Sequence, residues 1–275
     1  MTTLSERERR LRAQYSNASV LHTRMQIYKL FSTNPESWHR WAFGQLRLAP
    51  ESRVLDLGCG RGDLWLENRD RIPEGWQVTL SDFSPGMLRD AQAYLGALAG
   101  RFVFAVIDAR DIPFGPGSFD AVIANHMLYH INPGRGQALS EIARILKPGG
   151  RLYASTNGRS KRGSTGELTA RFNPHAGTRR QAPTSDGMPA TFHLENGGDQ
   201  LAPWFADVTV RRYENELLVT EAAPLIANVR TRNKLDEDQM IAFAEYVEAE
   251  IARHGAIRLA KDVGLFEACT AAQCR

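Results

Sequence analysis

Short apolar runs and amphipathic stretches alternate through the middle of the chain. Between the runs, apolar residues recur every three or four positions, which predicts helices that begin after Gly62, at Ser84 and at Pro133. Strands that alternate with helices in this way indicate an α/β fold with a mostly parallel sheet. The runs that predict buried strands are residues 53–57, 77–81, 102–107, 119–125 and 151–155.

Weaker patterns flank this core. A polar stretch and an aromatic-rich stretch predict a helical N-terminal cap over residues 1–50. Near the C-terminus, two alternating runs lie close enough to predict an antiparallel hairpin, and an amphipathic stretch after them predicts a long helix. These predicted elements are helices over 4–14, 35–46, 200–205 and 236–254 and strands over 208–213 and 216–220.

One large domain, residues 51–275, is expected to follow the cap. Residues 157–191 are rich in Gly, Ser, Thr, Pro and Arg and show no apolar period, so we expect a flexible insertion there. Residues 232–275 are expected to add a C-terminal helix and an extension. A chain of 275 residues is long enough for this arrangement.

Charge and cysteine content disfavour several classes of protein. The 34 basic and 31 acidic side chains give a formal net charge of +3, which is too small to indicate nucleic acid or an anionic membrane. We find no signal-peptide pattern and no apolar run of membrane-spanning length. The odd number of cysteines argues against a disulfide framework and favours a reducing cytoplasm. We expect Cys269 and Cys274 to be exposed thiols without a role.

The strand at 53–57 leads into a loop with glycine at every second position. The sequence from Asp56 to Gly62 is D-L-G-C-G-R-G. Glycine lets the backbone come close to a ligand at the end of a buried strand. The spacing differs from the dinucleotide pattern G-x-G-x-x-G, whose third glycine would fall at Asp63. An NAD-dependent dehydrogenase is therefore disfavoured.

Polar residues follow each of the next three strands. Asp82 follows the second strand, Asp108 the third and Asn125 ends the fourth. The carboxyl ends of parallel strands open on one edge of the sheet, where open α/β sheets bind ligands. A carboxylate in the position of Asp82 can accept both hydroxyls of a ribose. One in the position of Asp108 can accept an adenine amino group.

These motifs resemble those of the class I S-adenosylmethionine (SAM) dependent methyltransferases. The likeness runs from Val54 to about Ser155, and it is greatest to the branch that methylates quinones and other secondary metabolites. Five motifs occur in order: DLGCGRG at 56–62, SDFS at 81–84 with Met87, DARDIPF at 108–114, FDAV at 119–122 and ILKPGG at 145–150.

The resemblance implies a Rossmann-like, doubly wound, mostly parallel seven-stranded sheet with an antiparallel C-terminal hairpin, and SAM as the methyl donor. It implies that the glycines approach the methionine portion of SAM and that Asp82 holds the ribose. The full set of residues that the resemblance assigns to SAM binding is Asp56, Gly58, Cys59, Gly60, Gly62, Asp82, Phe83, Met87, Asp108, Ala109 and Asn125.

Methyl transfer from a sulfonium is an in-line displacement, so the protein mainly has to hold the reacting atoms in line. A nucleophile that carries a proton also needs a base. His126 and His130 are the candidates, since four positions would place them on one face of a helix. His193 is a weaker candidate. The H-E-x-x-H zinc motif is absent because Met127 follows His126, so we expect no metal.

The function favoured by these motifs is methyl transfer to an O, N or C atom of a small molecule, namely a secondary metabolite. Two alternatives stay open. The basic stretch over residues 159–180 could follow RNA, bind a protein or grip an anionic small substrate. A SAM-binding protein without catalysis also fits the motifs. We expect no nucleic-acid or membrane partner, and a homodimer stays open.

Aromatic residues gather before the first predicted strand. They could cap the cleft and shape an apolar substrate pocket, or they could form a core stripe, since aromatic side chains bury area in either case. These residues are Tyr28, Phe31, Trp38 and Trp41.

Overall fold

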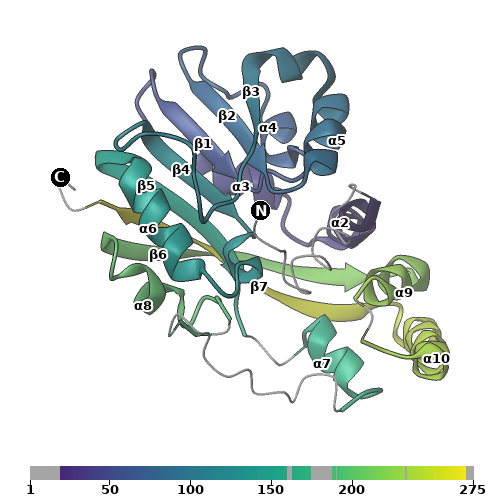
Figure 1. Ribbon diagram of the computed structural model, residues 1–275. Helices are drawn as coiled ribbons and strands as arrows, with labels where there is room; N and C mark the ends of the chain where they lie inside the picture. Colours follow the sequence, from purple (N-terminus) through teal and green to yellow (C-terminus); the bar gives the residue numbers. More distant parts are fainter. Residues whose placement is uncertain (1–18, 160–162, 175–187, 190, 233, 271–275) are drawn as a thin grey trace.

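A seven-stranded sheet crosses the molecule, and helices cover both of its faces (Figure 1). The computed structural model describes residues 19–159, 163–174, 188–189, 191–232 and 234–270. The strand order is β3-β2-β1-β4-β5-β7-β6, in which only β7 runs antiparallel to its neighbours. The strands are β1 (Arg53–Leu57), β2 (Gln77–Asp82), β3 (Phe102–Val106), β4 (Phe119–Asn125), β5 (Leu146–Asn157), β6 (Ala206–Val219) and β7 (Ile257–Cys269).

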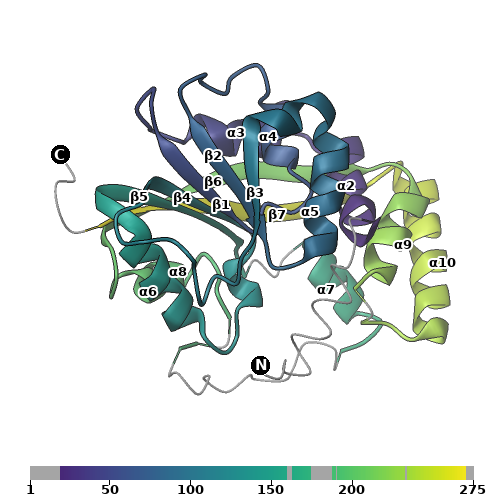
Figure 2. The same cartoon turned by 45° about the horizontal axis from the view of Figure 1, so that its top comes forward.

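Helices α6 and α8 lie on one side of the sheet, and α3 and α4 lie on the other (Figure 2). Two short 3-10 turns, η1 (Gly96–Arg101) and η2 (Leu128–His130), complete the described elements. The α-helices are α2 (Ser19–Phe31), α3 (Trp38–Gly44), α4 (Asp63–Glu67), α5 (Pro85–Leu95), α6 (Arg135–Ile145), α7 (Thr165–Ala170), α8 (Gly197–Leu201), α9 (Ala222–Arg230) and α10 (Glu237–His254).

Neighbouring residues of the central strands belong to two separate cores. Leu55 and Val122 pack in the core beneath α6 and α8, whereas Val54 and Ala121 pack in the core beneath α3 and α4. Successive side chains of a strand point to opposite faces of the sheet. Both faces of these strands are therefore buried, which is why they appear in the sequence as unbroken apolar runs.

A third core lies at the end of β6 and β7. There Ile27 of α2, Leu225 of α9 and Phe243 of α10 meet Leu217 of β6 and Leu259 of β7. Both views show α2, α9 and α10 gathered at this end of the two strands (Figures 1 and 2). This core joins the beginning of the described chain to its C-terminal elements.

Several predictions from the sequence are confirmed. The fold class, with a seven-stranded sheet that is mostly parallel and antiparallel at its C-terminal end, is the one observed. Ser84 caps α5 by accepting a hydrogen bond from the Met87 N–H, and Pro85 opens that helix. The amphipathic helix predicted over residues 236–254 is α10, and the structure adds a reciprocal capping box of Asp236 and Gln239 at its start.

The pairing predicted for the C-terminal hairpin is wrong. Residues 208–213 and 216–220 do not face each other, because both runs belong to the continuous strand β6, which pairs with β7. Asn215 lies where the turn was expected. Its Oδ1 accepts hydrogen bonds from Ser32 Oγ at 2.9 Å and from the Asn34 N–H at 3.1 Å. The polar residue thus serves a contact with the N-terminal segment rather than a turn.

Helices outside the central motifs were the least predictable. The sequence patterns did not predict α2 and α9, and the predicted helix over residues 4–14 lies outside the described residues. The stretch expected to be a flexible insertion contains α7, which Ser164 caps and which buries Leu168 in the third core. Short helices of this kind depend on tertiary packing rather than on propensity.

Two expectations drawn from composition can be compared with the structure. Cys269 is buried and takes part in a disulfide, so the expectation of an exposed free thiol is wrong for this residue. Cys274 lies outside the described residues. Across the ranges that the structure describes, no helix combines the length and the apolarity needed to cross a bilayer.

The register of β6 on β7 can be tested at Gly264. A Cβ at this position would lie 2.6 Å from the carbonyl oxygen of Arg211 on β6. We expect Gly264→Ala to lower the free energy of unfolding by about 2 kcal/mol, because the backbone ladder must shift to relieve the clash. Gly100→Ala is the control, since nothing lies within 4 Å of its added Cβ. Urea unfolding measures the free energy of unfolding of both variants. An equal loss in the two would contradict the observed register of β6 on β7.

Candidate active site

A cavity of about 2360 Å³ opens at the carboxyl ends of β1, β2, β4 and β5. It is lined by the glycine loop after β1, by Asp82 at the end of β2 and by Asn125 at the end of β4. Pockets for single small molecules measure roughly 300–1,000 Å³, so there is room for more than one. All residues predicted to bind SAM line this cavity except Gly62.

The loop after β1 depends on left-handed backbone conformations. The φ angles of Gly58, Gly60 and Gly62 are 71°, 57° and 84°, values that residues with a side chain rarely adopt. A Cβ on Gly58 would lie 2.9 Å from the Cβ of Met127. A Cβ on Gly62 would lie 3.1 Å from the side chain of Leu95. Gly62 therefore packs against α5 instead of facing the cavity.

Asp56 is a buried carboxylic acid of β1 with one satisfied oxygen. Its Oδ2 accepts a hydrogen bond from Trp65 Nε1 at 2.8 Å, while its Oδ1 has no partner among the described residues. Burial raises the pKa of Asp56 to about 7; the Trp65 hydrogen bond opposes this shift and the Asp82 carboxylate adds to it. An oxygen of this kind fits a ligand that brings a positively charged N–H group.

Backbone amides hold the carboxylate of Asp82. The Gly60 N–H donates to its Oδ2 at 3.3 Å and the Ser84 N–H to its Oδ1 at 2.9 Å. Burial nevertheless raises the pKa of Asp82. Burial and the carboxylates of Asp56 and Asp82 also raise the pKa of the Cys59 thiol well above its usual value. Cys59 is therefore an uncharged thiol at neutral pH and no nucleophile.

An arginine that the sequence analysis did not single out holds Asp108. Arg110 Nε donates to Asp108 Oδ1 at 3.0 Å and Arg110 Nη2 donates to Asp108 Oδ2 at 2.6 Å. The charge of Asp108 is thus balanced within its own loop. Ala109 and Met87 are buried, and both line the cavity. The sequence signal was the D-A-R spacing within the third motif.

His126 follows β4 in a left-handed conformation, with φ of 53°. The backbone N–H of His126 donates to Ser155 Oγ at 2.9 Å, and that hydroxyl donates to Asn125 Oδ1 at 3.0 Å. Burial, together with the charge of Lys261, lowers the pKa of His126 to about 3. Its ring is therefore neutral at pH 7, and it lies 5.3 Å from the ring of Trp38 between centroids.

The other candidate bases also line the cavity. His130 closes η2, and its ring lies 4.4 Å from that of Tyr129. Because His126 precedes this turn with a positive φ, the two histidines do not share a helix face as their spacing suggested. His193 Nδ1 lies 2.8 Å from Glu195 Oε2, at an angle unsuited to a hydrogen bond.

Unsatisfied buried polar atoms gather at the cavity. Within the described ranges, all side-chain atoms of this kind belong to residues that line it. An unpaired buried polar group costs about 1–3 kcal/mol, so a ligand that pairs with these atoms recovers that cost. The atoms are Trp38 Nε1, Asp56 Oδ1, His126 Nδ1 and His193 Nδ1.

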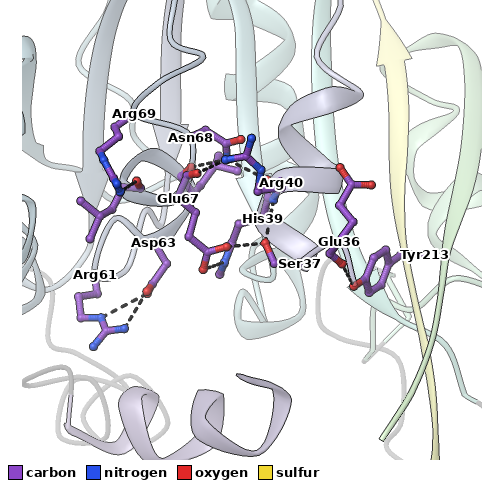
Figure 3. A network of polar contacts seen from close by, with 12 residues as sticks. Glu36, Ser37, His39, Arg40, Arg61, Asp63, Glu67, Asn68, Arg69 and Tyr213 are labelled. Carbon is purple, nitrogen blue, oxygen red and sulfur yellow. Dashed lines mark hydrogen bonds and ion pairs between the residues drawn. The ribbon is translucent and has the colours of Figure 1, made fainter. Parts of the chain in front are cut away.

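A polar network holds α3 between α4 and β6 (Figure 3). Glu67 of α4 accepts a hydrogen bond from Ser37 Oγ and pairs with His39 Nδ1 at 3.0 Å. On the other side, the Tyr213 hydroxyl of β6 donates to the carbonyl oxygen of Glu36. The sequence analysis did not predict this network, because its members carry no motif.

The aromatic residues of the N-terminal segment divide between two roles. Tyr28 and Trp38 line the cavity. Phe31 is buried in the third core, and Trp41 packs 5.4 Å from the ring of Tyr213. Part of this segment therefore forms a wall of the cavity and part of it is core.

Residues 54–150 match the family model described as a methyltransferase domain. A ubiquinone/menaquinone biosynthesis C-methyltransferase from Geotalea daltonii is 37% identical over 118 residues, which cover 42% of this chain and 50% of that protein. A demethylmenaquinone methyltransferase from Beutenbergia cavernae is 37% identical over 118 residues, which cover 43% of this chain and 46% of that protein. The chain thus spans about half the length of the curated relatives it matches.

Solved structures share the fold along most of the chain. The [4+2]-cyclase SpnF superimposes with a TM-score of 0.59 at 16% identity, covering 99% of both chains. Phosphoethanolamine N-methyltransferase 2 of Haemonchus contortus, solved with phosphomonomethylethanolamine and S-adenosylhomocysteine, gives 0.58 at 21% identity, covering 98% of this chain and 61% of that one. Residues 54–150 therefore match a methyltransferase domain, as the motifs predicted, and the solved structures share the fold of the chain.

The raised pKa of Asp56 predicts how stability depends on pH. An unfolded aspartate has a pKa of about 3.9, so folding favours the protonated acid, and this contribution is lost as the pH rises through about 7. We expect Asp56→Asn, which cannot ionise, to gain about 2 kcal/mol of stability relative to the wild type between pH 5 and pH 8. Urea unfolding at both values measures this gain.

The matched control for this experiment is the exposed residue Asp238 in the first turn of α10. Asp238→Asn should change stability by the same small amount at both pH values. A difference between wild type and Asp56→Asn that does not vary with pH would show that Asp56 is ionised throughout.

Proposed function

We propose that the protein transfers a methyl group from SAM to a small molecule by in-line displacement. The observation that carries this proposal is the buried, unpaired Oδ1 of Asp56, which lies between the glycine loop and Asp82 in the lining of the cavity. SAM brings an ammonium group and a ribose diol. The ammonium would pair with Asp56, and the two hydroxyls would donate to Asp82.

The remaining SAM contacts follow from the strand ends. Gly58 and Gly60 would let the backbone approach the methionine portion, and Asn125 would lie near the sulfonium. The family match covers all of these positions, which supports the assignment. The residues proposed around the adenine and ribose are Phe83, Met87, Asp108 and Ala109, all of which line the cavity.

Bound SAM supplies a methyl group on a sulfonium that leaves readily. The chain's own residues then have to exclude water and hold the acceptor in line. Such positioning lowers the activation free energy by several kcal/mol. Trp38 and Tyr213, held by the network around α3, form the wall that would do this. A fixed wall suits an acceptor that enters beside the methyl group.

The two histidines have different roles in this proposal. A base with a pKa of about 3, as for His126, holds a proton at pH 7 only at a cost of about 5 kcal/mol. His126 would therefore act as a neutral hydrogen-bond acceptor that orients the substrate. His130 would remove the proton from an acceptor that carries one.

A small acceptor is favoured over a macromolecule. The named relatives act in quinone biosynthesis, and the cavity exceeds the space that one cofactor fills. Of the basic stretch that suggested RNA, Arg159 and Arg171 are described, and Arg171 donates to the Tyr246 hydroxyl at 2.8 Å. A secondary metabolite as acceptor, a homodimer and a cytoplasmic location stay predictions.

A binding experiment tests the cofactor assignment. We expect S-adenosylhomocysteine to bind the purified protein, and Asp82→Ala to weaken binding by about tenfold or more, because two charge-assisted hydrogen bonds are lost. Asp238→Ala, a change on an exposed helix, should leave the affinity as it is. Isothermal calorimetry measures all three proteins. Absence of binding to the wild type would overturn the proposed function.

An activity experiment separates an enzyme from a SAM-binding protein without catalysis. We expect tritium from methyl-labelled SAM to appear in an organic-extractable product with a panel of quinols, catechols and hydroxybenzoates. At SAM concentrations below the wild-type Kd, turnover by Asp82→Ala should fall about tenfold or more, in line with its weaker binding. Binding without transfer to any acceptor of the panel would favour the non-catalytic alternative.

A further inference from the structure

One part of the cavity, lined by Tyr28, Arg232 and Lys261, is built by segments outside the matched domain. We call this part the acceptor half. The family match covers residues 54–150, whereas α2, the turn after α9 and β7 supply Tyr28, Arg232 and Lys261 to the lining. The named relatives therefore carry little information about this half. Its chemistry has to be worked out from the side chains themselves.

Tyr28 and Lys261 form a close pair. Lys261 Nζ donates to the Tyr28 hydroxyl at 3.3 Å and to Asn157 Oδ1 at 2.9 Å, and it lies 4.7 Å from the centroid of the Tyr28 ring. Asn157 ends β5, two residues beyond Ser155, whose hydroxyl binds Asn125. The ammonium group therefore lies beside the strand ends where the methyl group is expected.

Arg232 lines the same cavity as Tyr28. Its Nε donates to Asn228 Oδ1 at 3.3 Å, and the buried amide of Asn228 donates in turn to the carbonyl oxygen of Arg24 at 3.1 Å. The positive charge of Arg232 contributes to lowering the pKa of Tyr28. Asn228 thus positions the guanidinium at the cavity.

These two cations are not neutralised within the protein. In the part of the chain that the structure describes, the hydrogen-bond partners of Lys261 and Arg232 are neutral, and neither cation has a carboxylate at ion-pair distance. Asp262, the acidic residue next to Lys261, pairs with Arg212 instead. The acceptor half therefore keeps a net positive charge.

Tyr28 reports the strength of this positive field. Burial alone would raise the pKa of its phenol, yet the charges and hydrogen bonds of Lys261 and Arg232 outweigh burial and lower it. A site that stabilises a phenolate against the cost of burial will also stabilise an anionic group of a ligand. For the phenolate and for a bound anion alike, burial opposes the negative charge and the two cations favour it.

We propose that the methyl acceptor carries a carboxylate or phosphate group, which Lys261 and Arg232 bind with the Tyr28 hydroxyl as a further donor. The substrate would thus be an anionic small molecule rather than a neutral quinol. This inference rests on the proposed methyltransferase function, since it names the substrate class of the same cavity. Arginine and lysine bind both anions, with guanidinium suited to two-point contact.

Three para-substituted phenols of similar size test the proposal on the full chain saturated with S-adenosylhomocysteine. They are para-hydroxybenzoate, para-hydroxyphenyl phosphate and the neutral para-hydroxybenzamide. We expect at least one of the two anions to bind about tenfold more tightly than the amide by calorimetry, because each gains charge-assisted hydrogen bonds. The tighter of the two anions decides between a carboxylate and a phosphate acceptor.

Charge-removing variants locate the effect. Lys261→Gln and Arg232→Gln should each reduce the preference for the anion to about threefold or less, while the affinity for S-adenosylhomocysteine stays unchanged. Arg89→Gln on the exposed side of α5 removes the same charge outside the cavity and should keep the tenfold preference. Arg232 is exposed, so its variant folds even where Lys261→Gln does not.

The outcomes separate the two proposals. Binding of S-adenosylhomocysteine with equal affinity for the acid, the phosphate and the amide would overturn the anionic acceptor and leave the methyltransferase assignment standing. A preference for anions that survives in both charge-removing variants would overturn this site as its origin. No binding of S-adenosylhomocysteine would overturn both proposals together.

Discussion

The hydrogen bond from Trp65 Nε1 to Asp56 Oδ2 is the interaction on which the site depends. Trp65 is fully buried, with its ring 5.4 Å from Phe102 and 6.2 Å from Phe43. It therefore fixes the start of α4 against the end of β1. The loop between them must close within five residues, which requires the left-handed glycines. The same bond satisfies one oxygen of Asp56 and leaves the other for a ligand.

Sequence patterns predicted the elements whose burial can be recognised from residues close together in the chain. The central strands are buried on both faces, so their apolar runs were visible in the sequence. Helix α5 was predicted from the Ser84-Pro85 start signal and α10 from its amphipathic pattern. The hairpin prediction failed because Asn215 looks like a turn residue unless its distant partner Ser32 is known. Helix α9 was not predicted for a similar reason, since its apolar face packs against α2 and α10. Contacts across nearly two hundred residues leave no local period.

The candidate site divides in the same way. Carboxylates at strand ends could be predicted because parallel topology alone brings them to one edge of the sheet. Glu67 and Lys261 could not, because each acts through a distant partner that no spacing rule names, whereas the Arg110–Asp108 pair lay within the D-A-R of the third motif. The fold also accommodates a [4+2]-cyclase and an N-methyltransferase among its solved relatives. Topology therefore places a ligand, and only the variable walls decide what is done to it.

The charge of Lys261 acts on both His126 and Tyr28. It lowers the pKa of His126 in addition to burial, and it helps to lower that of Tyr28 against burial. An anion bound to Lys261 would offset this charge for both groups. The pKa of His126 would then rise only in part while the acceptor is in place, because burial is the larger cause of its low value. Occupation of the anion site would thus raise the proton affinity of the His126 imidazole, which lines the same cavity as Lys261.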